Sequence, residues 1–290
     1  KKNRKIVAIS AGMTLGTGLK KFSMEIPERF YDVGITEQHA VTMASSLALD
    51  GYIPVVAIYS TFLQRAYDQV IHDVSLQSSP VIFAVDRAGL VGEDGPTHHG
   101  PFDLSYFSCI PNIVISSPKD GSELIALLRT AVAYRKGPFV IRYPRSSCSV
   151  GELDPPKISV GTWELLQEGK GCAIIATGAM VEPAQQALPL LKKKGISPML
   201  INARFVKPFD HRMLRQIIKK VKTIITVEEN ACHGGFGSSV LQFCGEHKPG
   251  MRVHCIGLPD NFVEHGARPI LLKITQLDAG GLAKRISAVL

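Results

Sequence analysis

Glu37 lies where the sequence predicts a corner between an extended segment and a helix. The segment Phe30–Val33 is typical of a short strand, Gly34 permits a sharp turn, and Thr36 is suited to the N-cap of the helix that follows. Open α/β sheets bind their ligands at corners of this kind. Burial there raises the pKa of a carboxyl group and lets it exchange a proton with a heterocyclic nitrogen. The residues leave open a plainer role, in which the carboxylate only complements the dipole of the helix.

A second group of reactive side chains lies in the loop from Asp86 to Phe102, which reads DRAGLVGEDGPTHHGPF. Its composition is similar to that of a metal site, but Asp-x-x-x-His-His in a loop is a weak signal, and the nearby Arg87 disfavours a cation. We therefore predict no metal ligand here. We expect His98 to carry protons near neutral pH, oriented by Asp94.

Arginines gather at the ends of predicted strands and helices of the same half: Arg65, Arg87, Arg142 and Arg145. Guanidinium groups in such positions bind phosphate or carboxylate in a fork geometry. Tyr59 and Phe62 stand beside them at the end of an apolar strand. Two plainer roles stay open, because Arg65 is also spaced to pair with Asp68, and an isolated Phe62 is also typical of a core.

The elements that must position these side chains alternate between strand and helix, which is typical of a doubly wound α/β layer. Strands are predicted at Lys5–Ser10, Ile53–Tyr59, Pro80–Val85, Ile113–Ser116, Phe139–Arg142, Cys172–Ala176, Pro198–Asn202, Thr223–Val227 and Arg252–Ile256. A polar stretch without periodicity, containing Pro155, separates two series of elements. We predict an α/β protein with two doubly wound domains and mostly parallel sheets, residues 1–150 and 166–290, joined by a linker at 151–165.

Composition narrows the function further. With 45% hydrophobic and 20% charged residues, the chain has the composition of a globular protein with a large core. It has no apolar run of membrane-spanning length and no signal-peptide pattern, so we expect a cytoplasmic location and no membrane partner. Six cysteines without regular spacing favour reduced thiols. The net charge of +8 suits an enzyme for anionic substrates, and the lysine runs lack the interleaved aromatics typical of nucleic-acid binding.

One glycine-rich motif in the second half invites a separate interpretation. His233–Ser238 reads HGGFGS at the start of a predicted helix, where it could cradle an anion. It lacks the GxGxxG order and does not follow directly on a strand, so we favour a plain tight turn.

Several of these stretches occur together in a known family. GITEQHA, YSTFLQRAYDQ, DRAGLVGEDGPTHHG, FDLSY and RYPR, in this order and spacing, closely resemble the 1-deoxy-D-xylulose-5-phosphate synthases, which belong to the transketolase-like group of thiamine diphosphate enzymes. The resemblance is highly specific over residues 30–145. Farther on it rests on TVEEN, HGGFGS and LPDNFVEHG. It implies a pyrimidine-binding domain followed by a transketolase C-terminal domain.

The resemblance also implies roles for the residues singled out above. Glu37 matches the glutamate that hydrogen-bonds the aminopyrimidine ring of thiamine diphosphate and favours its imino form, Phe62 matches the aromatic that stacks on that ring, and Ile35 lies beside the cofactor. Asp94 and His98 match catalytic residues at the substrate end of the cleft. Residues matching those that hold the substrate phosphate are Tyr59, Arg65, Arg87 and Arg145. Arg142 is expected to be a structural neighbour only.

The family's reaction condenses pyruvate, with loss of carbon dioxide, onto D-glyceraldehyde 3-phosphate, in homodimers that feed isoprenoid, thiamine and pyridoxal synthesis. Family members hold Mg²⁺ and the diphosphate with a G-D-G motif and a downstream asparagine in a first domain. This sequence contains no G-D-G, the nearest piece being Gly92–Gly95 in a different context. We therefore expect the chain to be the C-terminal part of such a synthase and to be inactive alone.

Two alternatives remain. One is the β subunit of a 2-oxoacid dehydrogenase E1 or the small subunit of a split transketolase, both of which are naturally encoded without the diphosphate domain. The other is a catalytically idle α/β module that dimerises through the small-residue helix face Ala40–Ala48. A plant or algal source would move the expected location to the plastid.

Overall fold

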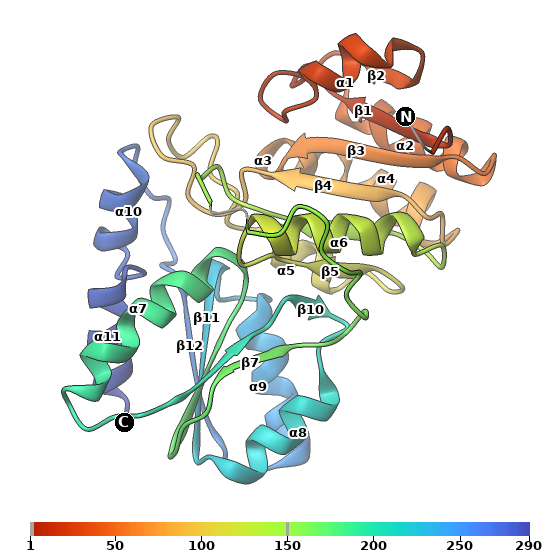
Figure 1. Ribbon diagram of the computed structural model, residues 1–290. Coiled ribbons are helices and arrows are strands. Elements are labelled where there is room, and N and C mark those ends of the chain that lie inside the picture. The colour runs from red at the N-terminus through yellow and green to blue at the C-terminus, as the bar shows by residue number, and fades with distance from the viewer. Residues whose placement is uncertain (1–2, 149–150) are drawn as a thin grey trace.

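The computed structural model describes residues 3–148 and 151–290 as two α/β halves, each built around one mostly parallel sheet. Figure 1 shows the first half above and the second below, with the N-terminus and the C-terminus in different halves. This arrangement confirms the predicted fold class. Among the described residues, no helix combines the length and the apolarity needed to span a membrane.

The strands and helices have the following bounds. The strands are β1 (Ile6–Ser10), β2 (Phe30–Asp32), β3 (Ile53–Tyr59), β4 (Ile82–Asp86), β5 (Val114–Ser116), β6 (Phe139–Arg142), β7 (Glu164–Gln167), β8 (Cys172–Ala176), β9 (Met199–Asn202), β10 (Phe205–Lys207), β11 (Thr223–Ala231) and β12 (Arg252–Leu258). The α-helices are α1 (Lys20–Glu25), α2 (Glu37–Leu49), α3 (Ser60–Leu63), α4 (Tyr67–Gln69), α5 (Asp103–Ser108), α6 (Gly121–Ala133), α7 (Val181–Lys192), α8 (His211–Lys220), α9 (Phe236–His247), α10 (Arg268–Ile274) and α11 (Ala279–Ala288).

The first sheet has seven strands in the order β10-β5-β6-β4-β3-β1-β2, and the second has five in the order β12-β11-β8-β9-β7. All neighbours are parallel except β10 with β5 and β7 with β9. In the first sheet β1 lies between β2 and β3, so the order of strands reverses there. A crevice therefore opens at the carboxyl ends of β1 and β3, where doubly wound sheets bind ligands.

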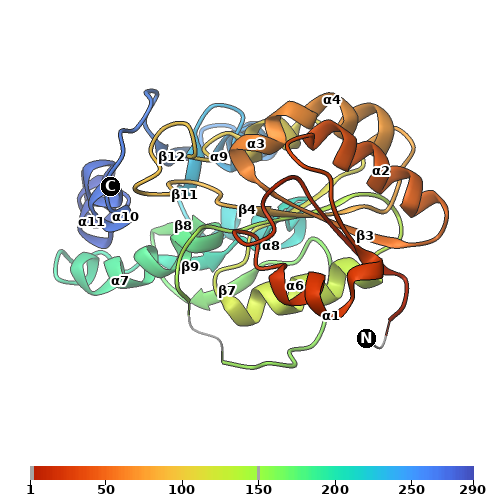
Figure 2. The ribbon, with the colours of Figure 1, turned by 90° about the horizontal axis from the view of Figure 1, so that it is seen from above.

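Helices cover both faces of the first sheet. Figure 2 shows α2, α3 and α4 on one side of the strands and α1 and α6 on the other. The small residues Ala40, Ala44 and Ala48 of α2 are 0%, 0% and 4% exposed, because this helix face packs on the chain's own sheet. These three alanines are therefore used within the chain, and a dimer contact through the exposed positions of Ala40–Ala48 stays a prediction. Small side chains serve here to bring α2 close to β3.

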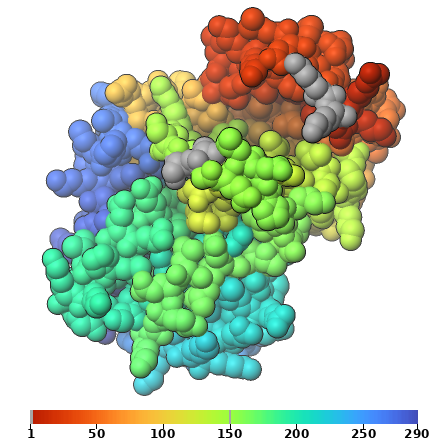
Figure 3. Space-filling model, in the orientation of Figure 1, coloured from red at the N-terminus to blue at the C-terminus, as the bar shows by residue number. Residues whose placement is uncertain are grey.

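The two halves share a sheet. Strand β10, which the sequence did not predict, leaves the second half and pairs antiparallel with β5 at the edge of the first sheet. Phe205 of β10 packs against Phe139, and the indole of Trp163 donates a 2.8 Å hydrogen bond to the Phe205 carbonyl. Figure 3 shows residues 151–163 (light green) on the face of the molecule where the two halves meet. The division at 151–165 stays a prediction, and β7 begins at Glu164, inside that segment.

A buried ion pair lies at the contact between the halves. Arg142 ends β6, and its Nε lies 3.2 Å from each carboxylate oxygen of Asp103 on α5. Their side chains are only 4% and 0% exposed. Arg142 Nη2 also donates to the Glu229 carbonyl of β11 at 3.1 Å. Arg142 is thus a structural residue that joins the first sheet to the carboxyl end of the second.

A second polar network crosses the contact at the other edge. Glu123, on α6 of the first half, is 4% exposed. It accepts a 2.9 Å hydrogen bond from Asn202 and lies 3.3 Å from Arg204, both from the second half. Lys119 Nζ reaches Glu164 at 3.0 Å. The relative position of the halves is therefore fixed at two separate places.

The first prediction concerns the buried pair. We expect Asp103→Asn to lower the free energy of unfolding by about 3 kcal/mol, because it leaves the Arg142 charge buried without a counter-charge. Urea denaturation followed by circular dichroism measures this difference. The control is Lys21→Gln, which removes an ion pair whose side chains are 87% and 40% exposed and should change stability by less than about 0.5 kcal/mol. Equally small losses of stability in both variants would contradict the role of Asp103 as the counter-charge of Arg142.

Candidate functional site

The loop after β1 forms one wall of the crevice. A Cβ atom added to Gly16 would lie 1.5 Å from the Tyr59 hydroxyl oxygen and 3.2 Å from Arg87 Nη2. The Gly16 carbonyl accepts a 3.0 Å hydrogen bond from Arg87. Only glycine fits at this position, because the backbone of the loop lies directly against these two side chains.

Asp32, at the end of β2, ties this loop to the corner that carries Glu37. Its carboxylate accepts hydrogen bonds from Thr14 Oγ1 at 2.6 Å, from the Gly12 amide at 2.7 Å and from the Gly34 amide at 3.1 Å. Burial acts to raise the pKa of Asp32, but these three hydrogen bonds outweigh it and hold the pKa below its usual value. An aspartate at a strand end beside a glycine-rich loop is a usable signal for this anchor, which was not predicted from the sequence.

Glu37 begins α2, and its side chain is only 2% exposed. Arg65 Nη1 lies 3.5 Å from Glu37 Oε2, while the Arg65 side chain is 54% exposed. The alternative pairing of Arg65 with Asp68 is wrong, since Asp68 instead contacts His72 at 2.8 Å. Glu37 is thus a shielded carboxylate, and its 3.5 Å contact with the half-exposed Arg65 is long for an ion pair.

Thr36 occupies the N-cap position of α2, as the sequence predicts. However, its hydroxyl donates to the Val33 carbonyl at 2.8 Å instead of accepting from a helix amide. The threonine therefore fixes the turn before the helix, and the dipole of α2 is complemented by Glu37 in its first turn.

Phe62 lies half-buried at the centre of the crevice. Its ring stacks with Tyr59 at a centroid distance of 5.8 Å and meets the edge of His98 at 5.3 Å. The Arg65 guanidinium lies 5.7 Å from the same ring. Phe62 also packs against the hydrophobic core, which confirms the core role considered for it from sequence, and its stacking on a cofactor ring stays a prediction.

Arg87 is held more rigidly than Arg65. It follows β4 with a φ of 58°, an uncommon conformation for a side-chain-bearing residue, and its guanidinium lies 3.6 Å from the centroid of the Tyr59 ring. Asp86 accepts a 2.6 Å hydrogen bond from the Arg87 amide and also contacts its guanidinium at 3.4 Å. Burial raises the pKa of Asp86 despite that cation, and it raises the pKa of Tyr59 in the same way.

Residues 88–101, here called the site loop, bring Asp94 and His98 to the crevice. Asp94 binds Arg145 Nη1 at 2.7 Å, and the two side chains are 40% and 50% exposed. The Nδ1 of His98 contacts the Thr97 hydroxyl at 2.9 Å. The expectation that Asp94 orients His98 is therefore wrong, because Arg145 takes the carboxylate and the neighbouring threonine contacts the imidazole.

Most of the predicted site residues are brought into one connected set. Direct contacts join Glu37, Tyr59, Phe62, Arg65, Arg87 and His98. The Asp94–Arg145 pair lies close enough for its charges to act on Tyr59. Ile35 is 77% exposed and lies by Gly12 at the rim. Within residues 3–148 and 151–290, no three His, Cys, Asp or Glu side chains are grouped to hold a metal ion.

The HGGFGS motif does form a helix N-terminus, but the group that it holds is the chain's own Glu228 carboxyl. Its oxygens accept 2.8 Å hydrogen bonds from the amides of Phe236 and Gly237 at the start of α9. A Cβ on Gly235 would lie 2.3 Å from Glu228 Oε2, which explains the glycine. Burial raises the pKa of Glu228 to about 7, and the two amides only partly offset this.

Two family descriptions match the chain. Residues 1–149 match "Transketolase, pyrimidine binding domain", and residues 161–282 match "Transketolase, C-terminal domain". The first match covers just over half of the sequence.

Curated relatives match the chain at about half identity. It is 52% identical over 286 residues to the 1-deoxy-D-xylulose-5-phosphate synthase of Aquifex aeolicus, covering 98% of this chain and 45% of that protein. It is 53% identical over 293 residues to 1-deoxy-D-xylulose-5-phosphate synthase 1 of Geobacter sulfurreducens, covering 100% of this chain and 46% of that protein. The chain thus spans less than half the length of these relatives.

Solved structures share the fold over almost the whole chain. A split-gene transketolase described as an inactive β4 tetramer superposes with a TM-score of 0.86 at 28% identity, covering 99% of this chain and 92% of that chain. A transketolase of Pichia stipitis in complex with sedoheptulose 7-phosphate superposes with a TM-score of 0.80 at 22% identity, covering 98% and 43%. The second likeness concerns the fold alone.

The second prediction follows from the raised pKa of Glu228. A carboxyl group with a folded pKa of about 7 and an ordinary value of 4.5 binds its proton more tightly in the folded state. Its contribution to stability is therefore complete below pH 4.5 and is lost as the pH rises through about 7, a change of about 3 kcal/mol. We expect Glu228→Gln to remove this part of the pH dependence, measured by urea denaturation from pH 4 to pH 8.

The matched control is Glu246→Gln, which changes an exposed carboxylate on α9 itself and should leave the pH dependence as it is. A Glu228→Gln protein with the same pH profile as the unmodified chain would show that Glu228 is already ionised in the fold.

Proposed function

We propose, since the chain belongs to the transketolase family, that it forms part of a thiamine diphosphate-dependent transferase, a 1-deoxy-D-xylulose-5-phosphate synthase. The reaction is the decarboxylative condensation of pyruvate with D-glyceraldehyde 3-phosphate. It is the first step of the non-mevalonate isoprenoid pathway and also feeds thiamine and pyridoxal synthesis. The relatives that match nearly all of this chain carry this enzyme name.

The observation that carries the proposal is the buried carboxylate of Glu37, which Arg65 links to the half-buried ring of Phe62. A hydrogen-bond acceptor next to a flat apolar surface fits an aminopyrimidine ring, with Glu37 bonding a ring nitrogen and Phe62 stacking on the plane. Ile35, exposed at the rim, would cover the ring's edge. Thiamine diphosphate, when bound, supplies an electron sink for the carbon of pyruvate that bonds the aldehyde. Glu37 holds the proton that this chemistry exchanges with the ring.

The cationic side chains of the crevice suit the phosphate of the aldehyde substrate. Arg87 is already oriented by Asp86, Tyr59 and the backbone of Gly16, so it loses little freedom on binding an anion. Arg65 and Arg145 are half-exposed and have room to close on it.

Two residues of the site loop are assigned to the chemistry at the substrate. We propose that His98, in contact with Phe62, carries a proton to or from the reacting oxygen. Asp94, paired with Arg145, places a negative charge at the outer end of the crevice. It thereby orients that arginine toward the phosphate.

The diphosphate and Mg²⁺ are proposed to be held by a unit outside these residues, as the resemblance implies. The active protein is then proposed to be a homodimer in the cytoplasm. The matched relatives give no support for a plastid location.

The rival function is the small subunit of a split transketolase, with the β subunit of a 2-oxoacid dehydrogenase E1 as a related form. The split-gene transketolase favours it, because that chain and this one cover each other almost completely. The synthase is better supported, since identity is 52–53% to the synthases and 28% to the split transketolase. The substrate decides: a synthase consumes pyruvate, whereas a transketolase needs a ketose phosphate donor.

The third prediction tests the role of Glu37. In the active protein that contains these residues, Glu37→Gln should lower kcat by about 100-fold or more, because an amide cannot exchange the proton. Formation of 1-deoxy-D-xylulose 5-phosphate measures the loss. The control is Glu182→Gln, which also removes a carboxylate from the first turn of a helix, α7, but on the surface. If both variants lose equally little activity, Glu37 serves only the helix dipole.

The fourth prediction concerns the chain by itself. The 290 residues are expected to fold but not to turn over pyruvate and D-glyceraldehyde 3-phosphate, because the contacts to metal and diphosphate provide most of the cofactor's binding energy. Circular dichroism tests folding, and a coupled assay with thiamine diphosphate and Mg²⁺ tests turnover. Sustained turnover by the chain alone would refute the expectation.

A further inference from the structure

The site loop is closed at its base by the first half of the chain. Gly89 and Gly100 exchange two backbone hydrogen bonds of 2.8 Å, which bring the two ends of the loop together. A Cβ on Gly100 would lie 2.4 Å from Ser60 Oγ, so the base fits tightly against α3. This closure fixes where the loop begins and ends but not the direction in which its tip points.

The second half holds the loop just beyond this base. The Leu90 amide donates to Glu229 Oε1 at 2.9 Å, and Arg268 Nε donates to the Leu90 carbonyl at 3.2 Å. Arg268 Nη2 and Glu229 Oε2 lie 2.5 Å apart, with side chains 18% and 2% exposed. A Cβ on Gly89 would lie 2.5 Å from Glu229 Cδ. Both backbone groups of Leu90 are therefore satisfied by one buried ion pair, here called the clamp.

Further contacts from the second half continue along the loop. The Gly266 amide donates to the Gly92 carbonyl at 3.3 Å. His99 accepts from the Val91 amide through Nδ1 at 2.9 Å, and its Nε2 lies 3.4 Å from the Glu264 carbonyl. Burial lowers the pKa of His99, so the ring is neutral, with its proton on Nε2 facing that carbonyl. Leu90 and Gly92 are thus bonded directly to the second half, whereas Val91 is bonded within the loop to His99, whose ring faces the Glu264 carbonyl.

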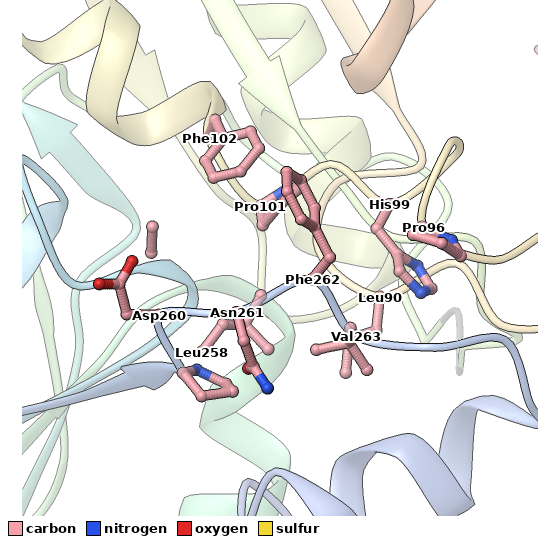
Figure 4. A pocket seen from close by; sticks show the side chains of 12 residues that line it. Leu90, Pro96, His99, Pro101, Phe102, Leu258, Asp260, Asn261, Phe262 and Val263 are labelled. Atoms are coloured by element: carbon pink, nitrogen blue, oxygen red, sulfur yellow. The ribbon is translucent and has the colours of Figure 1, made fainter.

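A cavity lies beside the loop, on the side that faces the segment 258–263. A cavity of about 240 Å³ separates Pro96, Pro101 and Phe102 from the segment 258–263. Figure 4 shows the rings of Phe102 and Phe262 beside each other at one end of this cavity and His99 at the other. Leu90 also lines this space, but its side chain is 1% exposed and packs in the hydrophobic core of the second half, so packing and the clamp together hold the base of the loop.

We infer that Glu229 and Arg268 are positioning residues that aim the tip of the site loop at the crevice. This inference rests on the proposed function, in which Asp94 and His98 act at the aldehyde end of the site. The tip contacts the first half through Thr61, which donates to the Thr97 carbonyl at 3.0 Å, and through the Asp94–Arg145 pair. While the clamp is intact, the second half holds one end of the loop and these contacts hold its tip. The position of the tip is therefore fixed.

The clamp acts on one substrate more than the other. Glu37 and Phe62 lie on α2 and α3, outside the loop, so the loop does not carry the groups assigned to the cofactor, and its one ring contact with them is that of His98 with Phe62. A loosened loop displaces Asp94. This displacement changes the orientation of Arg145, the side chain assigned to the substrate phosphate. A small misplacement of such groups lowers the rate of reaction strongly. We expect kcat/KM for D-glyceraldehyde 3-phosphate to fall about tenfold more than kcat/KM for pyruvate falls.

The test removes both charges of the clamp at once. The variant Glu229→Ala with Arg268→Met leaves no unpaired buried charge, and Glu229→Gln alone is the milder variant, since it keeps an acceptor for the Leu90 amide. The matched control is Glu123→Ala with Arg204→Met, which breaks an ion pair between the two halves and does not touch the loop. Cooperative thermal unfolding verifies that each variant folds.

Hydrogen–deuterium exchange of the 290-residue chain gives a readout without activity. We expect exchange in peptides covering residues 88–101 to accelerate about tenfold in the clamp variant, less in Glu229→Gln, and not in the control. If residues 88–101 are equally protected from exchange in the clamp variant and in the control, the inference is overturned. In the active protein, the substrate split described above is the second readout, and a uniform loss for both substrates would overturn it too. If exchange accelerates in the clamp variant of the 290-residue chain but the protein that joins these residues to a diphosphate-binding unit has no synthase activity, the proposed function is refuted and the clamp stands.

Discussion

The buried charge of Arg142 is the constraint on which the arrangement of the molecule depends. A guanidinium at 4% exposure is tolerated only with a counter-charge and saturated hydrogen bonds, and it obtains them from Asp103 and from the Glu229 carbonyl. This places the end of β6, the start of α5 and the end of β11 within one hydrogen-bonded unit. Because the Glu229 side chain bonds Leu90, the same residue transmits the position of the second sheet to the site loop.

The second sheet has a reversal of strand order of its own, and the first half fills it. Strand β8 lies between β9 and β11, so a crevice is expected at the carboxyl ends of β8 and β11. A Cβ on Gly178, after β8, would collide with Ser117 Oγ of the first half. The Glu229 side chain of β11 accepts a hydrogen bond from the Leu90 amide, also of the first half. The place where such a sheet binds ligands is taken by the chain itself. This explains why TVEEN, which reads like a site, contains structural residues: Glu228 caps α9, and Glu229 and Asn230 bond the first half.

The sequence allowed the layout and the main corner to be predicted because these follow from local patterns. Continuous apolar segments such as Ile53–Tyr59 predict central strands, and the four residues before Glu37 are enough to predict the turn that precedes it. Long-range pairings were not readable in this way. Strand β10 has three residues and joins a sheet built mainly from another part of the chain. The partners of Arg65 and Asp94 lie 28 and 51 residues away, and a nearer residue offered an equally good local match in both cases.

The two carboxylates of the crevice differ in what surrounds them, and this difference suits the division of labour in the proposed reaction. Glu37 is almost fully shielded, and its arginine is half-exposed at 3.5 Å, a contact long enough to be exchanged for a ring nitrogen at little cost. Asp94 is 40% exposed and holds Arg145 at 2.7 Å, a short pair in which the arginine is kept facing the crevice. A ring that takes Glu37 frees Arg65 for an anion. In the proposed function the buried acid and the half-exposed cation are thus coupled through one contact, so that binding of the cofactor ring would release Arg65 for a phosphate.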